Sequence, residues 1–238
     1  MTRVVVASDP GAVREAAAAL ADGAVVAVPT DTVYGLAVDP TQPEAIQRLF
    51  ALKGRPAEVP LPIVVAGDEQ VALVAGTLEA AARGLAERYW PGPLTLVVPR
   101  RPAFTVDLGG PPAVRGTVGV RRPDHAVLVA LCELLGPLAV TSANLHGAPP
   151  ATTPAEVLQA FSGSDRPALV LDGGACDGLP STVVECRGPS SRCLREGALP
   201  WSEIHGDESV ARERPGGSGG PGVDGAGPGG GHLWDAAR

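Results

Sequence analysis

Short apolar runs and helix-like stripes alternate near the N-terminus, and this pattern limits the fold more than any other feature of the chain. Asp9 and Pro10 have the properties of an N-cap and a first helical residue. The apolar stripe that follows them has helical spacing and ends at Gly23. The run AVVAV at 24–28 comes next and is typical of a buried strand. The sequence therefore predicts a helix followed by a buried strand in this region.

The same alternation continues through the rest of the chain. Thr41 and Glu44 form a capping box, which predicts a second helix that ends at Lys53. Apolar runs predict strands at 4–7, 61–66, 94–99, 117–121, 138–141, 168–171 and 182–186. Helical patterns occur at 77–89, 125–135 and 154–161, the last with a capping box from Thr153 to Glu156. Several strands follow one another without room for a crossover helix, so we expect a mixed sheet rather than a parallel one.

Composition shows how such a sheet must be packed. Of the 238 residues, 45% are hydrophobic but only 3% are aromatic, so the core must consist mainly of Val, Leu, Ile and Ala. We expect a single α/β domain over 1–205, because this length can bury one sizeable core. The segment 206–238 is rich in Gly and Pro and has few apolar clusters, which predicts a disordered tail.

Charge and cysteine content argue against several classes of protein. The formal net charge of −7 disfavours a protein that coats nucleic acid. The four cysteines form no C-x-x-C pair and have no His at metal-ligand spacing, so we expect no zinc site. No leader pattern and no 18-residue apolar segment occurs, and we expect no membrane partner and a cytoplasmic location.

Two polar segments follow the first predicted strand and the second predicted helix. PTDTVYGL at 29–36 places hydroxyls, a carboxylate and a Gly where the chain leaves the sheet, and ligands of open α/β sheets bind at such strand ends. Ordinary turn chemistry explains the same residues equally well. In KGRP at 53–56, Lys53 and Arg55 either stabilise the helix C-terminus or bind polyphosphate.

A pair of arginines ends the predicted strand in TVGVRRPDH at 117–125. Side chains alternate between the two faces of a strand, so only one of Arg121 and Arg122 can face a given pocket. Periodicity alone does not choose between them. His125 is typical of a helix start rather than of a catalytic site.

Two further segments combine small or hydroxyl residues with a strand end. TSANLHGAPPATT at 141–153 predicts a loop whose free N–H groups and following helix N-terminus favour an anion. GLPSTVVECRG at 178–188 and LREGA at 194–198 look like hairpin strands with a solvent-facing Arg195. None of the five segments is decisive alone.

Together and in this order, the five segments resemble the YrdC-like family of threonylcarbamoyl-AMP synthases over about residues 12–200. The resemblance implies a twisted mixed sheet with flanking helices that forms an open, positively lined cavity. It also implies that this cavity binds ATP, L-threonine and bicarbonate.

The resemblance assigns roles residue by residue. The positions implied for L-threonine are Thr32, Arg121, Ser142 and Ser181. Those implied for ATP are Arg55, Thr117, Asn144, Thr152 and Arg195. Lys53 beside the phosphates and Arg55 are the expected catalytic pair, and Arg121 is the inward arginine.

Three positions depart from the family pattern. Val59 stands where an Asn is frequent, Val64 where a polar side chain near threonine is common, and His146 where a Ser is usual. These departures bear on affinity and substrate choice more than on reaction type.

The implied reaction is the formation of threonylcarbamoyl adenylate with release of pyrophosphate, with Mg²⁺ accompanying ATP and no protein-bound metal. The product would pass to a downstream tRNA threonylcarbamoyl transferase complex, and direct tRNA binding is expected to be weak. Two alternatives stay open: a translation-associated module that binds RNA or nucleotide without turnover, and a domain that forms a carbamoyl adenylate.

Overall fold

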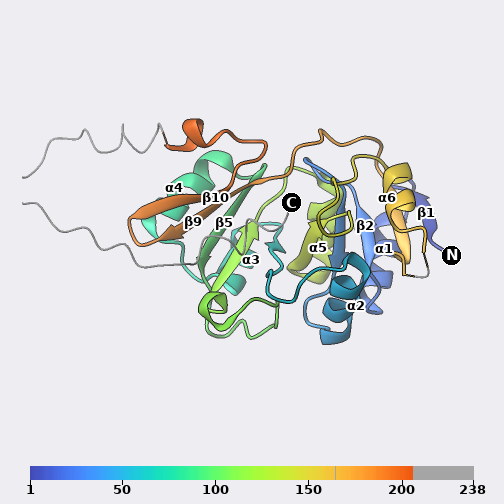
Figure 1. Cartoon of the computed structure of the whole chain (residues 1–238), viewed down its shortest axis with the longest axis horizontal. Helices are drawn as coiled ribbons and strands as arrows, with labels where there is room; N and C mark the ends of the chain where they lie inside the picture. Colours follow the sequence, from blue (N-terminus) through green and yellow to red (C-terminus); the bar gives the residue numbers. More distant parts are fainter. Residues whose placement is uncertain (164, 206–238) are drawn as a thin grey trace, which may run out of the picture.

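The structure is a computed structural model, and it describes residues 1–163 and 165–205. A single ten-stranded sheet runs through the molecule, with helices on both of its faces (Figure 1). The strands are β1 (Arg3–Val6), β2 (Val26–Val28), β3 (Gly35–Val38), β4 (Ile63–Val64), β5 (Leu94–Pro99), β6 (Thr117–Arg121), β7 (Leu138–Ser142), β8 (Leu169–Asp172), β9 (Thr182–Arg187) and β10 (Ser190–Arg195). The helices are α1 (Ala12–Ala21), α2 (Pro43–Lys53), α3 (Asp68–Val74), α4 (Ala80–Tyr89), α5 (Ala126–Leu135) and α6 (Pro154–Ala160), with a 3₁₀ turn at Pro112–Val114.

The sheet is mixed, as the close spacing of the strands predicts. Its order is β1-β8-β2-β3-β7-β4-β6-β5-β9-β10. The pairs β1/β8, β2/β8, β4/β6 and β5/β9 are parallel, and the other five neighbouring pairs are antiparallel. The expected α/β class is therefore confirmed.

Two apolar layers cover the two faces of the sheet. Buried side chains of α2, α3, α4 and α6 pack on one face, where Leu36, Leu49 and Leu96 are fully buried. Buried side chains of α1 and α5 pack on the other face, with Leu20 and Leu131 fully buried. Full burial of a Leu side chain contributes roughly 1.5–3 kcal/mol, so these aliphatic layers replace the aromatic core that the chain lacks.

Alternation along β9 separates the two faces and locates the site. Val184 packs in the layer with α4, whereas Val183 faces the opposite side with Val97 and Leu194. On that opposite side, the helix layer is formed by α1 and α5 over the other half of the sheet. The face of the sheet around β5, β6 and β9 is thus available to line a cavity.

Two helix starts differ from the sequence predictions. Asp9 is not the N-cap of α1: its carbonyl closes a turn with the N–H of Ala12, and the cap is Gly11 at φ 96°. Thr41 does not cap α2 either, because its hydroxyl donates to Asp39 Oδ1 and the cap is Gln42. The cap at Thr153 is confirmed, since its hydroxyl accepts from the N–H of Glu156.

Two elements were not expected and one strand is shorter than expected. β3 lies inside PTDTVYGL and pairs with both β2 and β7, and α3 has only 7 residues. The strand predicted at 61–66 is reduced to Ile63–Val64. The other predicted strands and helices agree with the structure to within a few residues.

The C-terminal part of the described chain remains attached to the core. Ile204 is fully buried in the layer that contains α4. The predicted tail at 206–238 lies outside the described residues, and the domain limit at 205 stays a prediction. Within the described residues, no helix has the length and apolar character needed to cross a membrane.

Candidate active site

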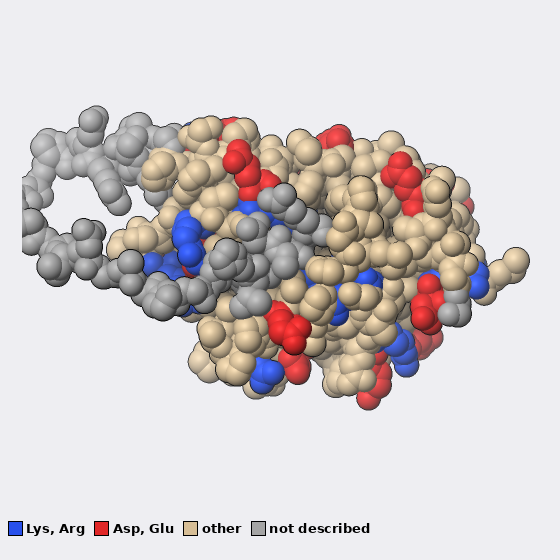
Figure 2. All heavy atoms as spheres, viewed as in Figure 1, with Lys and Arg blue, Asp and Glu red and all other residues tan. Residues whose placement is uncertain are grey.

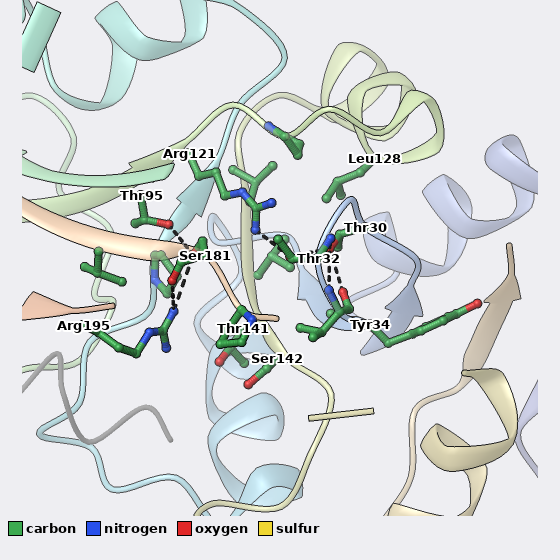
Figure 3. A pocket seen from close by; sticks show the side chains of 18 of the residues that line it. Thr30, Thr32, Tyr34, Thr95, Arg121, Leu128, Thr141, Ser142, Ser181 and Arg195 are labelled. Atoms are coloured by element: carbon green, nitrogen blue, oxygen red, sulfur yellow. Dashed lines mark hydrogen bonds between the residues drawn. The ribbon is translucent and has the colours of Figure 1, made fainter. Parts of the chain in front are cut away.

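A cavity opens at the middle of the sheet, where the ends of several strands meet (Figure 3). It contains about 750 Å³ of empty space, counting its open mouth, of which about 80 Å³ is open to the centre of a water molecule. Its walls come from the β2–β3 turn, the segment after α2, and the strands β4, β5, β6, β7, β9 and β10. The lining residues are Thr30, Thr32, Val33, Tyr34, Gly35, Arg55, Pro62, Val64, Thr95, Arg121, Pro123, Leu128, Val140, Thr141, Ser142, Pro180, Ser181, Val183 and Arg195.

Arg121, at the end of β6, is the arginine that faces this cavity. Its Nη2 donates to Asp31 Oδ1 at 2.6 Å, its Nη1 to Thr32 Oγ1 at 3.0 Å, and its Nε to the Gly92 carbonyl at 3.1 Å. Burial lowers the pKa of Arg121, and the Asp31 carboxylate opposes that shift. Arg122 points away and lies 3.7 Å from the exposed Asp68. The alternation rule is confirmed, and the structure resolves the choice that it left open.

The hydroxyls of the β2–β3 turn form an ordered chain beside Arg121. Thr30 Oγ1 donates its only proton to the Val33 carbonyl at 2.7 Å, so in its 2.9 Å contact with Thr32 Oγ1 it must accept. Thr32 therefore donates to Thr30 and accepts from Arg121. Gly35 follows because a Cβ there would lie 2.6 Å from Val140, too close for any other residue. The motif thus builds a cavity wall rather than only a turn.

Lys53, the last residue of α2, is only 2% exposed and binds the loop after β7. Its Nζ donates to the carbonyls of Ser142 and Asn144 and to Asn144 Oδ1, all at 2.8 Å. Burial, with Arg55 and Arg195 nearby, lowers the pKa of Lys53 to about 7. The three acceptors favour the ammonium and oppose this lowering. Lys53 joins two of the predicted segments, and it is not among the residues that line the cavity.

Arg55 lines the cavity with one nitrogen still available. Its Nε and Nη2 donate to the Val59 and Pro60 carbonyls at 2.9 Å each. Nη1 is buried and has no hydrogen-bond partner among the described residues. Burial and the charge of Arg195 lower the pKa of Arg55 to about 10. A buried cationic N–H without an acceptor indicates a place for an anion. Val59 departs from the family pattern in its side chain, but its contact with Arg55 is made by its backbone carbonyl.

Arg195 reaches the same cavity because β10 contains a bulge. The register pairs Cys193 with Val184 but Arg195 with Val183, which places Arg195 on the cavity face. Its Nη2 donates to the Ser181 carbonyl at 2.9 Å. The Ser181 hydroxyl also contacts Thr95 Oγ1 at 2.9 Å. The expectation of a solvent-facing Arg195 is therefore wrong. Because Arg195 lines the cavity, a role for it in binding ATP is geometrically possible.

Three predicted ATP positions lie outside the cavity lining. Thr117 starts β6, at the opposite end from Arg121, and donates to the Val114 carbonyl. Asn144 is 2% exposed and is bound by Lys53. The Thr152 hydroxyl donates to Glu156 Oε2 at 2.9 Å. The roles of these residues stay predictions.

The start of α6 is not an empty anion site. The Glu156 carboxylate accepts from both the N–H and the hydroxyl of Thr152, and these bonds lower the pKa of Glu156. The N–H of Glu156 is itself taken by Thr153. The expectation of free N–H groups at this helix start is therefore wrong for Thr152 and Glu156.

Sequence reasoning gave no role to two residues of the site. Thr95 lies in an apolar strand, and only the alternation of β5 could have placed its hydroxyl on the face of Val97. Asp31 is the carboxylate of PTDTVYGL, and its pairing with Arg121 joins segments 90 residues apart, which no local pattern indicates. His125 is the N-cap of α5, which agrees with the expectation of a helix start, and its side chain makes no cap hydrogen bond.

The fold and the cavity define an α/β protein in which buried cations and hydroxyls face an open pocket, an arrangement suited to anionic and polar ligands. The chain belongs to the Sua5/YciO/YrdC family: the family model described as "Telomere recombination" matches residues 18–197. The resemblance drawn from the five segments is confirmed.

Curated relatives cover most of the chain. A threonylcarbamoyl-AMP synthase of Pyrococcus abyssi is 40% identical over 195 residues, which are 81% of this chain and 56% of the relative. The Bacillus subtilis protein of the same name is 37% identical and is covered to 55%. A putative threonylcarbamoyl-AMP synthase of Mycobacterium tuberculosis is 36% identical and is covered to 85%. The chain spans about half the length of the first two relatives.

Solved structures show the same fold. Pyrococcus abyssi Sua5 complexed with L-threonine matches with a TM-score of 0.75 and 36% identity, over 87% of this chain and 60% of that one. Escherichia coli YciO matches with a TM-score of 0.72 over 86% of this chain and 98% of its own length, at 21% identity. These matches confirm the twisted mixed sheet with flanking helices.

Proposed function

We propose that this chain is an enzyme that joins L-threonine, bicarbonate and ATP into L-threonylcarbamoyl adenylate, with release of pyrophosphate and water. The observation that carries the proposal is the cluster of Lys53, Arg55 and Arg195 beside an open cavity, in which Lys53 and Arg55 are buried and the charge of Arg195 helps to lower the pKa of both. Such a cluster is costly without an anion, and a nucleotide polyphosphate supplies several negative charges. The names of the relatives support the threonine part.

Arg121 is suited to bind the carboxylate of threonine. A guanidinium has five N–H donors, and three of them are used by Asp31, Thr32 and Gly92. One N–H on each terminal nitrogen remains for a ligand, which is the geometry that a carboxylate prefers. The hydroxyls of Thr32, Ser142 and Ser181 line the same cavity and complete the proposed threonine site.

Arg55 and Arg195 are suited to bind the phosphates of ATP. Arg55 Nη1 is the buried N–H without an acceptor, and both guanidiniums line the cavity. Thr117, Asn144 and Thr152 are retained as further proposed ATP contacts. Among the described residues, no group of three His, Cys, Asp or Glu side chains could hold a metal ion. We propose that Mg²⁺ enters together with ATP, where it would neutralise phosphate charge.

The chemistry requires positioning more than a nucleophilic side chain. Bicarbonate takes up a proton and loses water to give CO₂. The threonine amine attacks the carbon of CO₂, forms an N–C bond and releases a proton, which gives a carbamate. A carbamate oxygen then attacks the α-phosphorus of ATP, and the bond to the β-phosphate oxygen breaks to release pyrophosphate. Charge builds on the phosphate oxygens, where Arg55 and Arg195 can stabilise it by preorganised hydrogen bonds.

Lys53 contributes to this proposal through the loop that it holds. Its three ammonium donors are taken by Ser142 and Asn144, so it fixes the end of β7, which carries the Ser142 hydroxyl, and the loop that follows. Its charge also adds to the field at Arg55 and Arg195. We propose that Lys53 positions Ser142 and Asn144 and supports the phosphate site from behind.

Pyrophosphate release from ATP and bicarbonate, with and without each amino acid, tests the function. We expect release that depends on threonine. Release driven by carbamoyl phosphate without threonine would instead support the carbamoyl-adenylate alternative. Salt-dependent RNA binding without ATP consumption would support the non-catalytic alternative. On the face shown in Figure 2 acidic and basic side chains are interspersed, which does not favour that second alternative.

Transfer to tRNA is the remaining part of the proposal. The proposed product, an acyl adenylate, is a reactive mixed anhydride. A second enzyme must therefore accept it before it is hydrolysed. We propose a tRNA threonylcarbamoyl transferase complex as that partner and the cytoplasm as the location. Transfer of labelled threonine to tRNA, with and without the transferase, measures this step.

A further inference from the structure

We propose that Asp31 is a positioning and specificity residue, which holds Arg121 for the threonine carboxylate and keeps phosphate away from that end of the cavity. This inference rests on the proposed function. Nothing in the sequence pattern assigns such a role to Asp31, which lies between two threonines of the β2–β3 turn.

The contact between the two side chains is short and shielded. Asp31 Oδ1 lies 2.6 Å from Arg121 Nη2, and the two side chains are 12% and 10% exposed. Arg121 is held from two other directions by Thr32 Oγ1 and the Gly92 carbonyl. The guanidinium plane is therefore fixed before any ligand arrives, and a fixed donor loses little freedom on binding.

The pair is poorly designed for stability alone. Asp31 Oδ2 is buried and has no hydrogen-bond partner among the described residues. In a buried ion pair with an unsatisfied oxygen, the electrostatic attraction offsets little of the desolvation cost. Apolar side chains can replace such pairs without loss of stability. A role in orienting Arg121 explains why the carboxylate is kept in this arrangement.

Charge separates the two ends of the cavity. Asp31 neutralises Arg121, whereas no carboxylate is among the groups that shift the pKa of Arg55, and Arg55 Nη1 is buried without an acceptor among the described residues. Figure 3 shows Arg121 and Arg195 on different sides of Ser181. A zwitterion such as threonine has no net charge and suits the neutralised end, and a polyphosphate suits the cationic end. Asp31 thus sorts the two substrates.

The experiment compares Asp31→Asn with the wild-type chain. The isosteric amide keeps the size of the side chain and removes its charge. We expect the KM for threonine to rise about tenfold, the scale of one charge-assisted hydrogen bond, and to rise much more than the KM for ATP. We also expect inorganic phosphate to become an inhibitor competitive with threonine. An unchanged threonine KM, or equal rises for both substrates, overturns the inference.

Two further variants separate charge from shape. Asp68→Asn removes the exposed partner of the neighbouring Arg122 and should change neither KM, which makes it the matched control. Asp31→Glu keeps the charge but displaces it by one methylene. It should raise the threonine KM without phosphate inhibition, and phosphate inhibition of this variant counts against the sorting role. If Asp31→Asn does not fold, the Glu variant still decides the positioning role.

The outcome for Asp31 can be told apart from the outcome for the function. Binding of 3-hydroxybutyrate, a carboxylate without the amine, is measured by ligand-detected NMR on the same variants. Binding of this analogue but not of threonine to the wild type contradicts the proposed substrate, and the effect of Asp31→Asn is then read on the analogue. Equal binding of the analogue to the wild type and to Asp31→Asn overturns the inference.

Discussion

The two ends of the cavity treat buried positive charge in opposite ways. At one end Arg121 is paired with Asp31 at 2.6 Å, and at the other the charge of Arg195 lowers the pKa of Arg55, whose buried Nη1 has no acceptor among the described residues. Neutralised charge costs little and selects by hydrogen-bond geometry, whereas uncompensated charge selects by the charge of the ligand. One fold thereby provides two kinds of recognition within a single pocket.

The largest effect is expected at the uncompensated end. Arg55→Ala should lower the rate of pyrophosphate release about 10²-fold, the scale for loss of one donor to transition-state charge. The control is Arg122→Ala, which removes an arginine outside the cavity. Comparable rates of pyrophosphate release in the two variants would contradict the proposal that Arg55 binds the phosphates of ATP.

At the neutralised end, Arg121→Ala should affect both binding and stability. The threonine KM should rise by more than tenfold, because a bidentate carboxylate contact is lost. The free energy of unfolding should fall by about 3 kcal/mol, since Asp31 is left buried without its partner. Adding Asp31→Asn to this variant should recover part of that loss in a urea titration. No recovery would mean that the two charges are not coupled.

The pH dependence of stability tests the charge behind the phosphate end. Burial lowers the pKa of Lys53 from 10.5 to about 7, so between these values the unfolded chain binds more protons than the folded chain. The cost of burying the ammonium is fully present below pH 7 and is relieved as the pH rises towards 10.5. The free energy of unfolding of the wild type should therefore rise relative to Lys53→Met between pH 7 and 9.5. A constant difference would show that the ammonium keeps an ordinary pKa.

The smallest effect is expected for the arginine next to Arg121. Arg122→Ala should change the free energy of unfolding by less than about 0.5 kcal/mol, because its contact with Asp68 is exposed and 3.7 Å long. Thermal melting of the variant measures this. A large loss of unfolding free energy would show that Arg122 contributes to stability in a way that its exposed contact with Asp68 does not explain.

Much of the fold follows from patterns that are local in the sequence. Strand alternation predicts that only one of Arg121 and Arg122 enters the cavity, and the N-cap predicted at Thr153 is present. The sequence does not predict β3, because this strand starts within a polar motif. Its strand conformation is stabilised by hydrogen bonds with β2 and β7, which its own sequence does not indicate. α3 was missed because one short helix has too few turns to show a periodic stripe.

The site was less predictable because its geometry depends on distant contacts. The five segments contain Arg121, Arg55 and Arg195, but no local pattern shows that Asp31 would pair with a residue 90 positions away. The bulge in β10 has no glycine signal of its own, and so Arg195 was expected in solvent. Lys53 was expected at the phosphates, and only the packed structure shows its ammonium bound to Ser142 and Asn144.

The extra residue in β10 has a consequence for the kinds of mutation that this gene can accept. Without the bulge, a hairpin of the present length would pair Leu194 with Val183 and Arg195 with Thr182, on the face away from the cavity. Loss of one codon between Ser190 and Leu194 would remove the extra residue and leave Arg195 opposite Val183, as it is now. An added codon would instead move Arg195 one position further, to the pairing with Thr182. The gene should therefore tolerate the loss of one codon in this hairpin better than the gain of one.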